Sequence, residues 1–64
     1  MDPSVAAREA LDASNHWRTR AAHARAFLGW IGSGGFFPND LALDEYAKIR
    51  EIAGWGSPQT NPLG

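Results

Sequence analysis

Residues 5–31 read VAAREALDASNHWRTRAAHARAFLGWI, and this stretch decides the fold. Its small and apolar side chains recur at alternating steps of three and four residues, which is the spacing of one buried helix face. This stripe consists of Ala7, Ala10, Ser14, Trp17, Ala21, Ala24, Leu28 and Ile31. Because the register does not slip between Val5 and Ile31, we expect a single long helix with one face for packing.

A short polar run in the middle of this stretch supports an alternative interpretation. Asp12, Ser14 and Asn15 carry side chains that compete with a helix for backbone hydrogen bonds. The helix can therefore break here, with Ser14 or Asn15 capping a second segment. We favour continuity because the seven-residue register passes through Ser14 unchanged, whereas a break normally resets it. The sequence leaves both possibilities open.

The long helix has recognisable start and stop residues. Asp2 can accept hydrogen bonds from the first free amides, and Pro3 is tolerated where no amide bond is yet required. The sequence GSGG at residues 32–35 supplies glycines, which favour the left-handed conformation at a helix end. Phe36 and Phe37 follow in a turn, and we expect them to pack beneath it as a plug for the end of a hairpin.

A second, shorter helical pattern lies in the last third of the chain. Its apolar face consists of Ala42, Tyr46, Ile49 and Ala53, widened by Leu43 and Ile52. Asn39 and Asp40 offer N-caps, and Asp44 and Glu45 place negative charge where the helix dipole favours it. Gly54 is the expected stop. We therefore expect a second helix of about 12 to 15 residues.

Together the two patterns predict an all-α fold, an antiparallel helical hairpin with a long first helix and a short second helix. Residues 1–55 form the hairpin domain, and residues 56–64 have the composition of a flexible, mobile C-terminal tail. The short arm covers the first helix only from Trp17 to Ile31. The part from Val5 to Leu11 then either stays solvated or packs against another molecule.

Composition and charge exclude several classes of protein. The chain of 64 residues contains no cysteine, so disulfides and thiolate zinc sites are excluded. Its formal charge of -1 gives no general attraction to nucleic acid or to anionic lipid. No apolar run approaches the roughly 20 residues needed to span a bilayer. We therefore expect a soluble, cytoplasmic protein with no membrane partner.

No combination of residues predicts catalysis or a cofactor. His16 and His23 lie seven residues apart, whereas two metal ligands on one helix need a spacing of three or four. The glycines at 32–35 follow a helix and have no nearby lysine, unlike a phosphate-binding loop. Nothing positions the Ser, His and Asp residues as a catalytic triad. We expect no enzyme activity, no metal, no cofactor and no small-molecule substrate.

The first helix is the candidate partner surface. Its small residues would let a partner helix approach closely, and the flanking arginines would set the register of that helix. Trp30 falls off the apolar stripe, so the hairpin cannot cover it and it is a candidate binding anchor. The predicted partner-binding residues are Trp17, Ala21, Ala24, Leu28, Trp30, Arg18, Arg20 and Arg25.

The arginines of the first helix have two alternative uses. In one, they bind nucleic acid through phosphates or base edges, although the chain is not basic overall. In the other, Arg20, Arg25 and the two histidines pair across the closed hairpin with the acidic residues of the second helix, at about 0 to 1 kcal/mol for each exposed pair. The acidic candidates are Asp44, Glu45 and Glu51.

The segments HWRTRAAHARAFLGWIGSGGFFP (16–38) and LDEYAKIREIAGW (43–55) resemble small helical proteins encoded by viruses of actinobacteria. The resemblance covers residues 8–55 and consists of an Ala/Arg-rich helix, the helix stop FLGWIGSGGF (27–36) and a short second helix. It implies a viral accessory protein that self-associates or binds a host protein in the host cell cytoplasm. The alternatives are a nucleic-acid-binding accessory using the arginine-rich centre, or a minor structural component of a virus particle.

Overall fold

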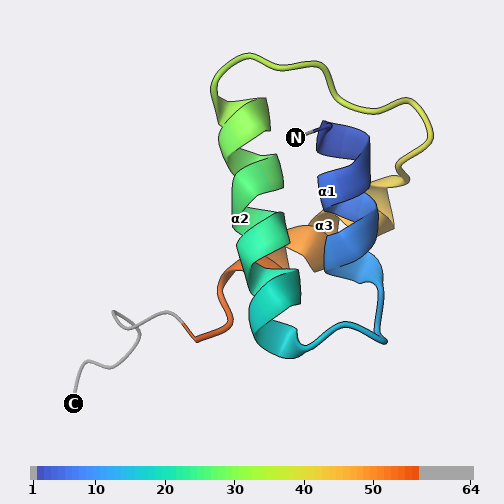
Figure 1. Cartoon of the computed structure of the whole chain (residues 1–64). Helices are drawn as coiled ribbons and strands as arrows, with labels where there is room; N and C mark the ends of the chain where they lie inside the picture. Colours follow the sequence, from blue (N-terminus) through green and yellow to red (C-terminus); the bar gives the residue numbers. More distant parts are fainter. Residues whose placement is uncertain (1, 57–64) are drawn as a thin grey trace.

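The computed structural model describes residues 2–56, and this part of the chain contains three α-helices and no strand. Helix α1 spans Pro3–Leu11, α2 spans Trp17–Gly32 and α3 spans Leu43–Ala53. Helices α1 and α2 lie side by side and antiparallel, and α3 crosses behind them (Figure 1). The all-α prediction is confirmed, whereas the count of two helices is wrong. The predicted flexible tail lies outside the described residues, except for Gly56.

The long first helix is the main correction, because the chain turns back between α1 and α2. Asp12 Oδ1 accepts hydrogen bonds from the Ser14 amide at 2.9 Å and the Ser14 hydroxyl at 2.7 Å. Asn15 Nδ2 donates to the Glu9 carbonyl at 3.0 Å and to Glu9 Oε1 at 2.7 Å. These side chains satisfy backbone groups that the helix would otherwise have to bond. The polar run therefore ends α1 instead of continuing it.

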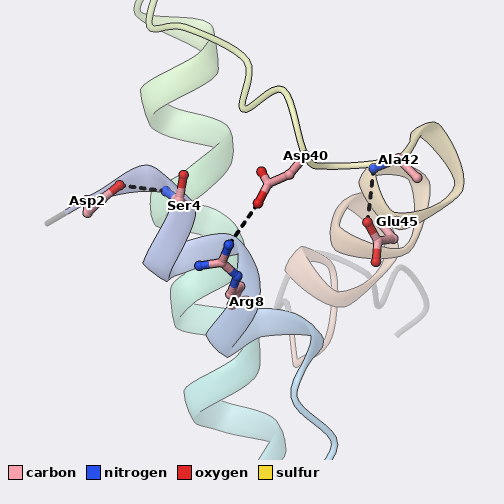
Figure 2. A network of polar contacts seen from close by, with 6 residues as sticks. All are labelled: Asp2, Ser4, Arg8, Asp40, Ala42 and Glu45. Carbon is pink, nitrogen blue, oxygen red and sulfur yellow. Dashed lines mark hydrogen bonds and ion pairs between the residues drawn. The ribbon is translucent and has the colours of Figure 1, made fainter.

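Helices α1 and α2 both begin at a side-chain cap. Asp2 Oδ1 accepts from the Ser4 amide at 2.9 Å, which confirms the predicted start of the first helix (Figure 2). At the start of α2, His16 Nδ1 accepts from the Arg18 amide at 3.1 Å. The cap of the second segment is therefore His16, two residues after Ser14. Each cap satisfies one of the amides that have no partner within the helix.

Helix α3 is 11 residues long, slightly shorter than predicted. Its N-cap is Ala42, not a residue at 39–40. Glu45 Oε1 accepts from the Ala42 amide at 2.9 Å, so a glutamate in the first turn satisfies the cap (Figure 2). Gly54 is the C-cap, as the sequence predicts.

Two side-chain contacts fix the loop between α2 and α3. Trp30 Nε1 donates to the Phe36 carbonyl at 3.0 Å. The indole lies so close to Gly35 that a Cβ there would come within 2.2 Å of it, so residue 35 must be glycine or the ring must move. Farther along the loop, Asp40 pairs with Arg8 of α1 at 2.7 Å (Figure 2). The loop is thereby attached to both α2 and α1.

The core lies where the three helices meet. Its large, fully buried side chains are Phe27, Ile49 and Ile52. Phe27 contacts Phe37 and Tyr46 edge to face, with ring centroids 6.5 and 6.4 Å away. Phe37 and Tyr46 also contact each other, at 5.3 Å. The predicted aromatic plug is therefore confirmed for Phe37 and wrong for Phe36, which is 85% exposed.

Small residues let α1 pack closely on α2. The buried alanines are Ala6, Ala7 and Ala10 of α1 and Ala21 and Ala24 of α2. Helix α1 contacts α2 more extensively than it contacts α3. The predicted lack of cover over residues 5–11 is therefore wrong, because the turn at residues 12–16 folds this segment back onto the rest of the chain.

Candidate functional site

The structure divides the predicted partner-binding residues into buried and exposed groups. Ala21 and Ala24 are buried, and Leu28 packs against the core. Helix α1 of the same chain lies on this small-residue face, where the prediction placed a partner helix. Trp17 and Trp30, in contrast, are 43% and 40% exposed, near opposite ends of α2.

Arg20 and Arg25 connect α2 to the C-terminal ends of the other two helices. Arg20 Nε donates to the Ala10 carbonyl at 2.8 Å, and its Nη2 reaches the next carbonyl of α1 at 3.4 Å. Arg25 Nε donates to the Ala53 carbonyl at 2.8 Å, and its Nη2 donates to the Trp55 carbonyl. The last carbonyls of a helix lack partners within it, so each arginine caps a helix end.

The predicted ion pairs between the arginines of α2 and the acidic residues of α3 do not form. Within residues 2–56 the salt bridges are Arg8–Asp40 at 2.7 Å and Lys48–Glu51 at 3.5 Å. Arg18, Arg20 and Arg25 therefore have no contacting carboxylate in this part of the chain.

An open apolar depression lies at the N-terminal end of α2. It is lined by Trp17, Trp55 and Gly56. The Trp17 ring rests on Gly56, where a Cβ would lie 2.7 Å from the indole, and the φ of 71° at this glycine also disfavours other residues. Trp55 is half-buried and packs against the core from the other side. The two indoles thus form a firm apolar floor.

Basic groups lie over and beside these two indoles. Arg18 Cζ lies 5.3 Å from the Trp17 ring centroid, and Arg20 Cζ lies 5.2 Å from that of Trp55. The His16 ring stacks beside Trp17 at 5.9 Å. The positive end of the α2 dipole lies here too, because this is the N-terminus of the helix. The first turn of α2 contains no acidic residue to compensate it. We call this surface the Trp17 face, and it consists of Trp17, Arg18, Arg20, Trp55 and Gly56.

The nearby carboxyl group of Asp12 is held in its charged form. Hydrogen bonds from the Ser14 hydroxyl and then the Ser14 amide lower the pKa of Asp12 below its usual value of 3.8, and the charge of Arg20 adds to this effect. Asp12 therefore stays ionised while it closes the turn between α1 and α2.

A second apolar surface, more enclosed than the first, lies at the other end of α2. Pro3 and Ala6 of α1 face Ala26, Gly29, Trp30 and Ser33 of α2 across an open groove. Exposed Val5 lies on α1 as well. The Trp30 side chain contributes to this groove while its Nε1 anchors the loop, so it has a structural role in addition to any contact with a partner.

Sequence reasoning missed Trp55 and Gly56 as part of a surface. It placed Trp55 at the end of the hairpin domain and Gly56 in the tail, because no local pattern shows that α3 crosses to the beginning of α2. In the described part of the chain, no cluster of His, Asp or Glu could hold a metal ion. Within residues 2–56, every helix is too short or too polar to cross a membrane.

The Trp17 face is therefore the best candidate for function on geometric grounds. It combines the largest aromatic residue type, an apolar floor and a rim of guanidinium groups. Comparisons of this chain with protein-family models, with curated proteins and with solved structures found no match.

Proposed function

We propose that this chain is a small, non-enzymatic protein-interaction module that docks through the Trp17 face, either on another protein or on a second copy. The observation that carries this proposal is the exposure of Trp17 beside the half-buried Trp55, with a guanidinium group near each ring. Tryptophan and arginine are the residue types that most often dominate the binding energy of protein interfaces. The proposed interface thus lies at the beginning of α2 and not along its buried alanines.

The exposed part of Trp17 is large enough to matter for binding. An aromatic side chain carries about 150–250 Å² of surface, of which 43% is exposed here, leaving roughly 100 Å² for a partner to cover. At about 25 cal/mol per Å², covering this surface contributes about 2.5 kcal/mol. The positive rim adds selectivity, because it favours partners with acidic groups and repels basic ones.

The cellular setting belongs to the same proposal. The resemblance of residues 8–55 to small proteins of actinobacterial viruses supports a viral accessory role in the cytoplasm of the host cell. In that setting the chain would act by occupying a surface of a host protein or by assembling with itself.

The test is site-specific photo-crosslinking in cells that produce the chain. A photoreactive phenylalanine derivative replaces Trp17 in one variant and Ala47, an exposed position on α3, in the control variant. We expect defined protein adducts from position 17 that are absent from position 47 and lost when Arg18→Glu is added. Identical adduct patterns from the two positions would refute docking through this face.

Single-stranded nucleic acid is a second candidate, favoured by the arginines that have no contacting carboxylate beside two indoles. Bases stack on aromatic rings, and phosphates pair with guanidinium groups. Titration with a single-stranded oligonucleotide at increasing salt separates the two functions, because phosphate binding weakens steeply with ionic strength. Tight oligonucleotide binding at physiological salt that Arg18→Glu abolishes would favour this candidate over protein docking.

A further inference from the structure

We propose that a second copy of this chain occupies the Trp17 face, and that it binds with the acidic beginning of its own α3. This acidic end consists of Leu43, Asp44 and Glu45. The inference rests on the proposed function, since it names the partner of the same surface.

The acidic end presents an unused apolar side chain beside two carboxylates. Leu43 is the first residue of α3 and is 79% exposed, so most of its side chain contributes nothing to the core. Asp44 and Glu45 are exposed and take no part in the salt bridges found within residues 2–56. Asp44 Oδ1 accepts from the Glu45 amide. Glu45 Oε1 accepts from the Ala42 amide, as Figure 2 shows. Each carboxylate therefore has a second oxygen available for a partner.

The two surfaces are complementary in apolar character and in charge. The exposed Leu43 matches the apolar floor of the Trp17 face, and the neighbouring carboxylates match its guanidinium rim. Arg18 is exposed, and Arg20 uses only part of its five N–H groups on the carbonyls of α1. Charge also sets the direction of docking, because two Trp17 faces repel each other, as do two acidic ends.

These surfaces cannot meet within one chain. They lie at opposite ends of α3, since Leu43 begins this helix and Trp55 follows its end, and 11 residues span about 16 Å. In Figure 1 the beginning of α3 lies behind α1, whereas its end lies behind α2. Contact therefore requires two copies, arranged head to tail. Every added copy leaves one surface of each kind open, so growth continues unless a ring closes.

Sedimentation velocity of the purified full chain tests the inference. At about 50 mM salt we expect the average mass to increase with protein concentration. At about 500 mM salt we expect the association to weaken about tenfold or more, because the Debye length falls well below 10 Å.

Charge-reversal variants identify the surfaces. Arg18→Glu and Asp44→Lys should each lower the association constant about tenfold or more. The matched controls Arg50→Glu and Glu51→Lys make the same charge changes on α3, outside both proposed surfaces. Their association constants should stay within about twofold of that of the parent chain. An equimolar mixture of the Arg18→Glu and Asp44→Lys chains should associate again, because each retains one intact surface. Circular dichroism confirms that every variant is folded.

Two results would overturn the inference. One is a monomer at every concentration in low salt, and the other is association that neither Arg18→Glu nor Asp44→Lys weakens. A monomeric chain that still crosslinks a different protein from position 17 overturns self-association and leaves the proposed docking function intact. A monomer without adducts from position 17 overturns both.

Discussion

Replacing Phe27 with leucine tests whether the three-ring cluster holds the helices together. Phe27 is fully buried and contacts the rings of Phe37 and Tyr46 edge to face. Leucine keeps an apolar side chain at the site but removes both ring contacts. Each aromatic pair contributes about 0.5–1.5 kcal/mol beyond its buried area, so we expect the free energy of unfolding to fall by about 2 kcal/mol.

Thermal unfolding followed by circular dichroism measures this loss. In a domain of this size, 1 kcal/mol shifts Tm by about 4–8 °C, so Phe27→Leu should lower Tm by about 8–16 °C. A typical stability of about 0.05–0.15 kcal/mol per residue corresponds to about 3–8 kcal/mol for residues 2–56. The variant should therefore still be mostly folded at 25 °C, and the transition should remain measurable.

The same substitution at the two neighbouring phenylalanines provides the control. Phe36 is 85% exposed, so Phe36→Leu should change the stability by less than about 0.5 kcal/mol. Phe37 is 38% exposed and contacts both other rings, so Phe37→Leu should fall between the two. If Phe36→Leu costs as much as Phe27→Leu, or if Phe27→Leu is neutral, the ring cluster does not close the core.

Three further predictions concern the loops. Gly35→Ala should destabilise the chain by about 1–3 kcal/mol in urea unfolding, because its Cβ would lie 2.2 Å from the Trp30 indole. The control Gly32→Ala has open space around its Cβ and should be neutral or stabilising. Trp30→Phe should cost about 1 kcal/mol through loss of the indole donor, and an unchanged urea midpoint in this variant would contradict its assignment as a loop anchor. The pKa of Asp12 is lowered in the folded state by Ser14, so its stabilising contribution is complete above the unfolded value near 3.8 and is lost as pH falls through the folded pKa. The urea midpoint should therefore drop in this acidic range, and Asp12→Asn should flatten that part of the profile; an unchanged profile would show that the charge of Asp12 does not support the turn.

The sequence predicts the helical class and three of the six helix ends in residues 2–56, but not the direction of the chain after α1. Asp2 and Gly54 act through local hydrogen bonds and backbone conformation, so their roles can be read from the sequence. The apolar register through Ser14 does not exclude a chain that folds back, because the alanines on either side of the break are buried in that arrangement too, while Ser14 and Trp17 become exposed. The hydrogen bonds of Asp12 and Asn15 end α1 and let the chain turn back. The tendency of these residue types to end helices is visible in the sequence, but the unbroken register favours a continuous helix.

The candidate site was predictable only in part, for a related reason. Trp17 was predicted to lie on the packing stripe and Arg18 at its edge, both as partner-binding residues, and both are exposed. Ala21 and Ala24 were predicted to face a partner, yet small residues allow close helix packing within a chain as well as between chains. Trp55 reaches Trp17 only because α3 crosses to the beginning of α2, which depends on tertiary structure rather than on local spacing.

The two arginine caps have a consequence for how freely this sequence can change. Their acceptors are main-chain oxygens, so the side chains at residues 10, 11, 53 and 55 can be exchanged without removing the acceptor atoms. Arg20 and Arg25 themselves are harder to replace, because a lysine carries no planar fork that reaches two oxygens at once. Natural variants should thus retain arginine at these two positions of α2.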